Sequence, residues 1–222
     1  MVKQINLNAI NLIIFDLDDT LVKLSIDYAK LRKKLSNFVK KQYGIRNEFK
    51  PLLGSINNVA ILTNKKGISK EKSKRDMFNI VKNAELDGAK KSSLMPYAKE
   101  TIQFFKRKGM KIAIVSRNSN KAVKIALQKH KLPYNLIIGF ENTKRTKPFP
   151  DAIRLAIRKL HAKPKNSLII GDHPYDIIAG KKAKTAIIGI ASGKYTTKDL
   201  KKAGADYTFI SLNKMRGLLG KR

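Results

Sequence analysis

The sequence predicts an α/β fold: an open parallel sheet with helices on both faces, interrupted by an inserted helical domain. Two observations predict the sheet. Short, continuously apolar runs recur along the chain, and amphipathic helical stretches lie between them. A third observation predicts the insertion, because residues 23–93 contain helical spacing and no comparable apolar run. With 222 residues, of which 42% are apolar, the chain can bury one core and support a small accessory domain.

The first apolar run, 12–15, ends at an aspartate and suits a strand that is buried on both faces of a parallel sheet. Five further runs predict strands, the last of them more weakly: 111–115, 135–138, 167–170, 185–188 and 207–210. Amphipathic helices are expected between them at 97–108, 120–131 and 150–162. Gly109 suits a helix end, and Pro150 suits a first helical turn. Strands that alternate with helices indicate right-handed crossovers and a Rossmann-like core.

The inserted segment shows helical spacing from Tyr28 to Tyr43, which Gly44 ends, and again from Met77 to Ala84. We therefore expect a core made of residues 1–22 and 94–222 and a helical cap domain made of residues 23–93. The apolar side chains of this domain are expected to form its own small core. The charged stretches around 65–67 and 70–75 are expected to form a solvated loop or a helix start.

The chain is strongly basic, with 48 Lys and Arg against 16 Asp and Glu and a formal net charge of +32. Such a field attracts nucleic acids, anionic lipids or phosphorylated metabolites. The basic residues are spread evenly, since 23–93 holds 18 basic and 6 acidic residues and the rest holds 30 and 10. We interpret the charge as a composition bias, and we expect nucleic acid to bind only nonspecifically if at all.

Two absences narrow the class of protein. There is no Cys, which excludes disulfides, thiolate zinc sites and a cysteine nucleophile. No apolar run is long enough to span a bilayer, and residues 1–11 do not resemble a signal peptide. We expect a soluble cytoplasmic protein without a membrane partner, and the sequence leaves its oligomeric state open.

Five of the 16 acidic residues lie in two short clusters, one containing Asp16, Asp18 and Asp19, the other Asp172 and Asp176. The first cluster stands at the carboxyl end of the first predicted strand, the edge of an open parallel sheet where ligands bind. Of two neighbouring carboxylates, one can attack phosphorus while the other transfers protons.

The second cluster follows another predicted strand, so it is expected at the same edge of the sheet. Together with Asp16, Asp172 and Asp176 offer the hard oxygen ligands that Mg²⁺ prefers. Ser116, after the strand at 111–115, offers a hydroxyl donor to a phosphate oxygen. Lys147, just before a predicted helix, supplies a positive charge that balances phosphate and carboxylates.

Four segments in this order and spacing resemble the motifs of the haloacid-dehalogenase-like hydrolase superfamily, most closely its phosphoglycolate-phosphatase-like members with a helical cap. The segments are 14–22 (Ile-Phe-Asp-Leu-Asp-Asp-Thr-Leu-Val), 115–118 (Val-Ser-Arg-Asn), 147–151 (Lys-Pro-Phe-Pro-Asp) and 171–177 (Gly-Asp-His-Pro-Tyr-Asp-Ile). The resemblance covers nearly the whole core and none of the cap. It implies a Mg²⁺-dependent phosphatase that hydrolyses a small phosphorylated metabolite, such as a phosphoglycolate-like phosphomonoester, through an aspartyl phosphate.

The resemblance also implies a role for each matching residue. Asp16 would be the nucleophile and Asp18 the general acid and base. The phosphate-binding residues would be Thr20, Ser116 and Lys147. The Mg²⁺ ligands would be the carboxylates of Asp16 and Asp172, the main-chain carbonyl of Asp18, and Asp176 directly or through water. Two neighbours of Ser116 are candidates for substrate contacts, Arg117 and Asn118.

Several alternatives stay open at this point. Phosphomutases, pyrophosphatases and phosphonate hydrolases use the same core, and the last would require a cap lysine that forms a Schiff base. A nucleic-acid-associated basic protein is an alternative from another class. The sequence departs from the family pattern at Asp19 and Lys184, where Gly is common, and at His173, where a small residue is common. The cap carries no signature, so the sequence does not identify the substrate.

Overall fold

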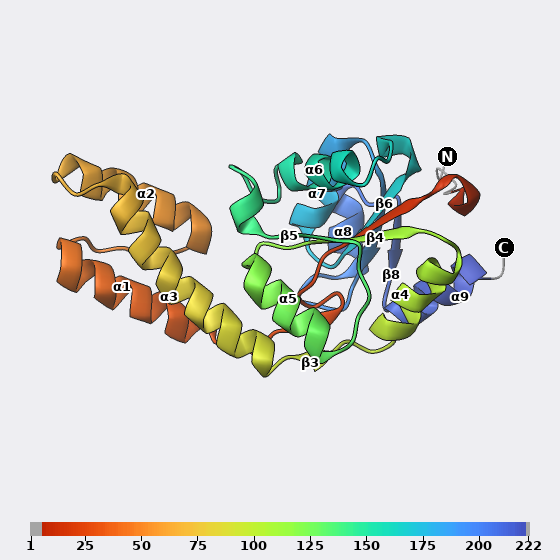
Figure 1. The fold of residues 1–222 in the computed structure, drawn as a ribbon, viewed down its shortest axis with the longest axis horizontal. Helices are drawn as coiled ribbons and strands as arrows, with labels where there is room; N and C mark the ends of the chain where they lie inside the picture. The colour runs from red at the N-terminus through yellow and green to blue at the C-terminus, as the bar shows by residue number, and fades with distance from the viewer. Residues whose placement is uncertain (1–5, 221–222) are drawn as a thin grey trace. The chain divides into compact units, whose positions relative to one another are not determined.

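The computed structural model describes residues 6–220 and divides the chain into two compact units. One unit, the core, comprises the chain up to Leu24 and the chain from Ser92 onward. The other, the helical unit, is Ser25–Lys91. The first five residues of the expected core segment lie outside the described residues. The chain therefore enters and leaves the helical unit once, which the colour along the chain lets the reader follow in Figure 1.

The core contains the predicted parallel sheet. Its strands are β1 (Leu12–Phe15), β4 (Lys111–Val115), β5 (Leu136–Ile138), β6 (Ser167–Gly171), β7 (Ala186–Ile190) and β8 (Tyr207–Phe209). Their order is β5-β4-β1-β6-β7-β8, and every neighbouring pair is parallel. β1 lies between β4 and β6, and all four of its residues are buried. The apolar run at 12–15 therefore forms a strand that other elements cover on both faces.

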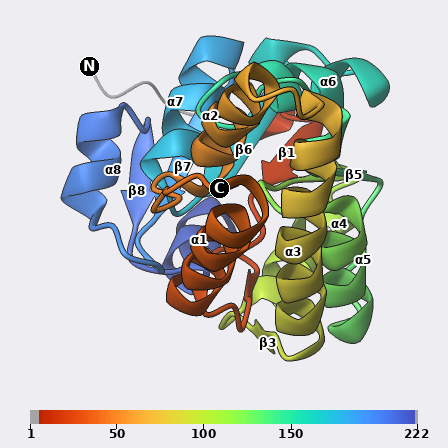
Figure 2. The same ribbon diagram turned by 90° about the vertical axis from the view of Figure 1, so that its left-hand side faces the viewer.

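Helices cover both faces of this sheet, as predicted (Figures 1 and 2). They are α4 (Ala98–Arg107), α5 (Asn120–Lys129), α6 (Asp151–Lys159), α7 (Pro174–Ala183), α8 (Thr197–Ala203) and α9 (Leu212–Gly220). Alternation along β1 sends side chains to the two faces in turn. Ile14 packs in one apolar cluster with Ile153 of α6 and Ile177 of α7, whereas Phe15 contacts Phe105 of α4 with ring centroids 6.1 Å apart. The core thus consists of a helix layer, the sheet and a second helix layer.

Short elements complete the core. Three 3₁₀ turns lie at Leu7–Ala9, Phe140–Asn142 and Pro164–Asn166. β2 (Val22–Lys23) and β3 (Ser93–Leu94) form a two-stranded antiparallel pair. The two chain segments that lead to and from the helical unit are therefore tied together by this pair.

The helical unit contains α1 (Tyr28–Tyr43), α2 (Leu52–Lys65) and α3 (Lys70–Lys90). Asp27 caps α1 by accepting a hydrogen bond from the Lys30 amide at 2.9 Å, and Gly44 ends it with a φ of 64°. The helices share an apolar cluster whose fully buried members include Leu35, Val39, Phe49, Ile56, Val59, Ala60 and Met77. The apolar residues of the segment thus form a core of their own.

One feature of this unit differs from the sequence-based expectation, because α2 was not predicted. The charged stretch 70–75 forms the first turns of α3, one of the two expected outcomes, and the side chain of Ser69 accepts a hydrogen bond from the Lys72 amide there. α2 contains Gly54 and several β-branched residues and asparagines, which have low helix propensity. Its apolar residues pack into the shared cluster, and this tertiary packing stabilises a helix that propensity disfavours.

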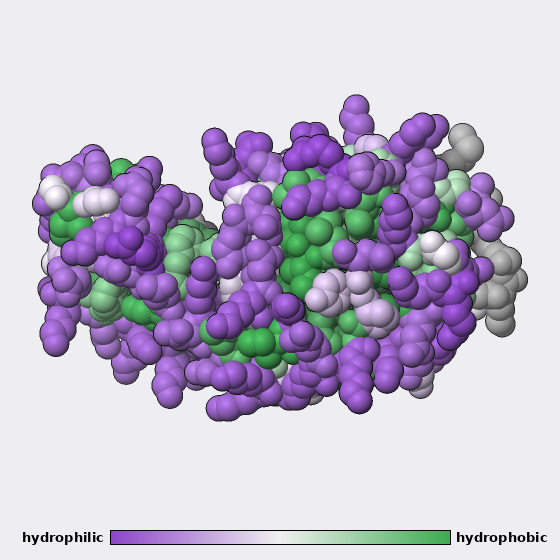
Figure 3. All heavy atoms as spheres, in the orientation of Figure 1, coloured by the Kyte–Doolittle hydropathy of each residue, from purple (hydrophilic) through white to green (hydrophobic). Residues whose placement is uncertain are grey.

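Hydrophilic side chains cover most of the face drawn in Figure 3, over both units. Residues 6–220 include no helix that combines the length and the apolar character needed to cross a membrane.

Candidate active site

The predicted site residues of the core gather at the carboxyl edge of the sheet. Asp16 follows β1, Ser116 follows β4 and Asp172 follows β6, and these three strands are neighbours in the sheet. Lys147 lies in the loop that leads to α6, and Asp176 lies in the first turn of α7. Parallel strands end at one common edge, and this is why residues far apart in the sequence meet there.

Lys147 lies at the centre of this group. Its Nζ is 2.5 Å from Asp16 Oδ1 and 2.5 Å from Asp176 Oδ1, and it donates a hydrogen bond to the carbonyl of Val115 at 2.8 Å. Its side chain is 3% exposed. Burial by itself lowers the pKa of an ammonium group, but the two carboxylates outweigh that effect, so the pKa of Lys147 is raised. The ammonium group therefore stays charged at neutral pH.

Three carboxylates converge beside this lysine. One oxygen each of Asp16, Asp172 and Asp176 lies within 4.8 Å of the others. Burial, followed by repulsion from the neighbouring carboxylates, raises the pKa of Asp172. Burial also raises the pKa of Asp16, and Lys147 partly counters it. Closely spaced buried carboxylates fit a divalent cation, which relieves their repulsion, and an all-oxygen donor set fits Mg²⁺.

Asp18 lies outside this carboxylate group. Its Oδ1 accepts a hydrogen bond from the Leu24 amide at 2.8 Å. Its side chain is half-buried, and this burial raises its pKa to about 7. A carboxyl group with this pKa can both give and take a proton near neutral pH, which a general acid and base must do.

The hydroxyl groups of the predicted phosphate-binding residues already have protein partners. Thr20 Oγ1 donates to Asp172 Oδ1 at 3.1 Å, and Thr20 is fully buried. Ser116 Oγ donates to Asn118 Oδ1 at 2.9 Å and accepts from the Asn118 amide at 3.1 Å. The structure thus places Thr20 against a predicted metal ligand and the buried side chain of Asn118 against Ser116.

An aromatic group lies beside the carboxylates. The ring of His173 has its centroid 4.5 Å from that of Tyr175 and 4.6 Å from that of Tyr195. His173 Nδ1 accepts a hydrogen bond from the Tyr175 amide at 3.0 Å, and the His173 amide donates to Asp176 Oδ2 at 3.1 Å. Burial, and then the positive charge of Arg117, lowers the pKa of His173 to about 4. The imidazole is therefore neutral at neutral pH, and its contacts help to hold the segment from Asp172 to the first turn of α7.

Sequence reasoning missed the loop after β7. Ser192 Oγ donates to the carbonyl of Asp19 at 2.6 Å, and a Cβ atom added at Gly193 would overlap Asp172 Oδ2. This loop therefore packs against both acidic clusters and requires glycine for its close approach. The position of this loop in the sequence could have revealed it, because the loop follows a strand of the same parallel sheet and so reaches the same edge.

The backbone explains why glycine is common in the family at the positions of Asp19 and Lys184. Asp19 has a φ of 57° and Lys184 a φ of 62°, the left-handed region in which glycine is favoured. Asp19 forms the turn after Asp18, and Lys184 ends α7. His173 stands at the N-cap of α7, a position that small polar residues usually occupy.

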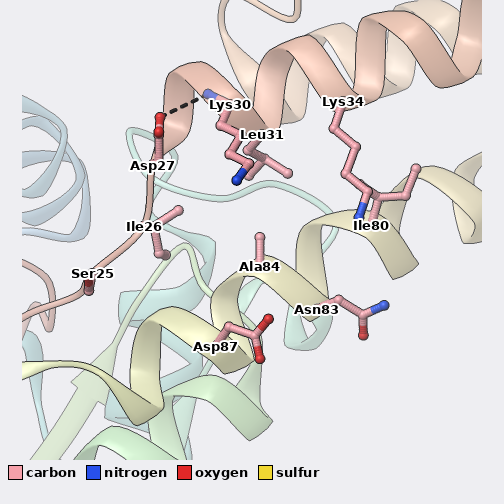
Figure 4. A pocket seen from close by; sticks show the side chains of 10 residues that line it. All are labelled: Ser25, Ile26, Asp27, Lys30, Leu31, Lys34, Ile80, Asn83, Ala84 and Asp87. Atoms are coloured by element: carbon pink, nitrogen blue, oxygen red, sulfur yellow. Dashed lines mark hydrogen bonds between the residues drawn. The ribbon is translucent and has the colours of Figure 1, made fainter.

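The helical unit has a pocket of its own between α1 and α3, with a volume of about 280 Å³ (Figure 4). Leu31, Ile80 and Ala84 contribute apolar side chains, and Lys30, Lys34 and Asp87 contribute charged ones. None of the predicted site residues lines this pocket.

Comparison with known proteins gives the same family as the motifs. The family model described as haloacid dehalogenase-like hydrolase matches residues 13–190. Among curated proteins, the pyrophosphatase PpaX of Bacillus mycoides is 26% identical over 186 residues, covering 82% of this chain and 84% of that protein. PpaX of Bacillus cereus strain B4264 is also 26% identical over 186 residues, covering 82% of this chain and 83% of that protein.

Solved structures share the fold. A hydrolase from Pseudomonas syringae superposes with a TM-score of 0.70 at 21% identity and covers 94% of this chain and 97% of its own. A protein from Haemophilus somnus, described as a predicted phosphoglycolate phosphatase, superposes with a TM-score of 0.65 at 21% identity and covers 95% and 98%.

Proposed function

Because the chain belongs to the haloacid dehalogenase-like hydrolases, we propose that it is a Mg²⁺-dependent phosphatase that hydrolyses a small phosphorylated metabolite through a phosphoaspartate. The observation that carries this proposal is the meeting of Asp16, Lys147, Asp172 and Asp176 at one buried point. These residues come from three separate parts of the chain. Their convergence supports a site for a divalent cation together with a phosphoryl group.

In the first step, an oxygen of the Asp16 carboxylate attacks phosphorus, and the bond between phosphorus and the leaving-group oxygen breaks. Asp18, protonated at this point, gives its proton to that oxygen. The pKa of Asp18, about 7, suits this transfer. In the second step, water attacks phosphorus, Asp18 takes a proton from the water, and the bond between phosphorus and Asp16 breaks. The products are the alcohol and inorganic phosphate, and both carboxyl groups return to their initial state.

Other residues bind and orient the phosphoryl group. Lys147 would place its ammonium charge beside the phosphoryl oxygens, and Ser116 would donate its hydroxyl. Asn118 orients Ser116 by accepting its hydroxyl hydrogen bond, and Thr20 orients Asp172 by donating its own. We also assign Thr20 to phosphate binding. Mg²⁺, held by the carboxylates of Asp16, Asp172 and Asp176 and the carbonyl of Asp18, would neutralise phosphoryl charge. We assign residues 25–91 to a cap domain that excludes water and selects the leaving group.

Phosphate release from p-nitrophenyl phosphate, with Mg²⁺ and with EDTA, tests this proposal. Asp16→Asn is expected to lower kcat by about a thousandfold or more, because an amide cannot replace the nucleophile. Asp27→Asn is a matched control, since Asp27 is exposed and asparagine caps a helix as well as aspartate. A wild-type protein without activity, or activity that Asp16→Asn retains, would contradict the mechanism.

A second candidate is pyrophosphate hydrolysis, which is favoured by similarity to curated pyrophosphatases across most of the chain. The same residues would serve, with phosphate as the leaving group. Comparison of pyrophosphate with phosphomonoesters as substrates separates the two candidates.

Borohydride trapping followed by mass spectrometry tests for the Schiff base of a phosphonate hydrolase. A salt titration against short RNA and DNA tests for nucleic-acid binding, whose affinity would fall steeply with salt.

A further inference from the structure

Arg117 follows Ser116 directly, and its guanidinium lies over the ring of Tyr175, with Cζ 5.3 Å from the ring centroid. Arg117 belongs to the loop after β4 and Tyr175 to the segment after β6, and these strands flank β1 on its two sides. The contact therefore joins the loop after β4 to the first turn of α7, and β1, which leads to Asp16, lies between β4 and β6.

The Tyr175 ring orients this guanidinium without cancelling its charge, as cation–π contacts with arginine do. No carboxylate in residues 6–220 forms an ion pair with Arg117. By contrast, the guanidinium of Arg145 donates to both oxygens of Asp151 at 3.1 Å. Arg117 is also exposed, so its donors are available to a ligand.

Tyr175 is itself held in place. Its ring packs at 4.5 Å from that of His173, and its amide donates to His173 Nδ1 at 3.0 Å. His173 contacts Tyr195 on the next loop. The contacts that support the guanidinium therefore join the loop after β4, the first turn of α7 and the loop after β7.

We propose that Arg117, positioned by Tyr175, binds a second anionic group of the substrate. This rests on the proposed phosphatase function and narrows it to phosphate esters or anhydrides that carry a carboxylate or a second phosphate close to the transferred phosphoryl group. The fork of an arginine binds carboxylate and phosphate through two parallel hydrogen bonds. Its position directly after Ser116 places the second anion within a few atoms of the phosphoryl group.

The test compares 2-phosphoglycolate with 2-phosphoglycolamide, which replaces the carboxylate with a neutral amide of similar shape. The wild-type protein is expected to prefer the charged substrate in kcat/KM by about 10- to 100-fold, the range for hydrogen bonds to charged groups. Arg117→Gln is expected to lower this preference by about tenfold or more. Pyrophosphate, assayed in parallel, shows whether a phosphate or a carboxylate is the better second anion.

Three further variants separate recognition from general effects. Arg107→Gln removes an equal exposed charge at the end of α4, before the amino end of β4, and is expected to keep the wild-type preference. Tyr175→Leu is expected to reduce the preference and Tyr175→Phe to keep it, since phenylalanine retains the ring. If the wild-type protein hydrolyses neither substrate, nor p-nitrophenyl phosphate, the phosphatase proposal fails. If it hydrolyses them and Arg117→Gln leaves the preference unchanged, only the assignment of Arg117 is overturned.

Discussion

Asp18 has two properties that conflict, because the carboxyl group proposed to transfer protons also destabilises the fold. Burial raises its pKa from 3.8 to about 7. Because its pKa is higher in the folded state than in the unfolded state, the folded protein binds the proton more tightly. The contribution of Asp18 to the free energy of unfolding is therefore fully present below about pH 4 and is lost as the pH rises to about 7. We expect Asp18→Asn, which removes the charge, to stabilise the protein at pH 8.

The size of this gain follows from the pKa. A rise from 3.8 to about 7 corresponds to at most about 4 kcal/mol, since a tenfold change in a protonation equilibrium is worth about 1.4 kcal/mol. Asp18 is only half-buried, and water around the side chain reduces the effect. The asparagine Oδ1 can still accept the hydrogen bond from the Leu24 amide. We therefore expect Asp18→Asn to raise the free energy of unfolding by about 2 kcal/mol at pH 8.

Urea denaturation of wild type, Asp18→Asn and the control Asp27→Asn, at pH 8 and pH 4.5 in EDTA, measures this effect. EDTA removes divalent ions, whose binding would itself stabilise the folded state. The gain is expected to fall to about 1 kcal/mol at pH 4.5, because Asp18 is then largely protonated in the folded wild-type protein but still largely ionised in the unfolded one. An equal gain at both pH values, or no gain at pH 8, would refute the reasoning from burial of the charge.

Three further changes test other parts of the core. Lys147→Met removes the ammonium group from the buried carboxylates and is expected to lower the free energy of unfolding by about 3 to 5 kcal/mol in urea denaturation at pH 8. The loss should be smaller at acidic pH, where the carboxylates take up protons, and an equal loss at both pH values would contradict this. Gly193→Ala should displace the Asp172 carboxylate and weaken Mg²⁺ binding by about tenfold in calorimetry, whereas Gly217→Ala, which has open space around it, should not. Lys184→Gly should raise the unfolding free energy by about 1 kcal/mol, because Lys184 has a left-handed φ, while Lys182→Gly inside α7 should lower it by about as much.

The sheet could be predicted because parallel strands buried on both faces require continuous apolar runs, and each such run in the core is bounded by polar or turn-forming residues. The site could be located for a related reason. Once Asp16, Ser116 and Asp172 were placed at the ends of parallel strands, the topology brought them to one edge without further information. The ion pair between Lys147 and Asp16 agrees with the resemblance to the family, which assigned both residues to one site. Without that resemblance, the sequence does not show where the side chain of a lysine in a loop points.

α2 could not be predicted in this way, because its helical state depends on residues outside it. Gly54 and the β-branched residues of its sequence favour other conformations, and burial of Ile56 and Val59 in the apolar cluster of the helical unit stabilises the helix. The loop after β7 was missed for a different reason. It contributes a close backbone approach at Gly193 and no side chain of catalytic type, so residue chemistry gave no signal.

The contact between Arg117 and Tyr175 shows where sequence-based reasoning about such a site ends. Motif spacing places both residues at the same edge of the sheet. Whether the guanidinium turns toward Tyr175, toward a carboxylate or toward solvent depends on side-chain packing among segments that follow three different strands. The positions of Asp16, Ser116 and Asp172 follow from topology, because each of these residues comes directly after a strand. The proposed recognition of a second anion depends instead on contacts between segments that follow different strands, so these contacts are the place to look for what distinguishes this chain from relatives that share its motifs.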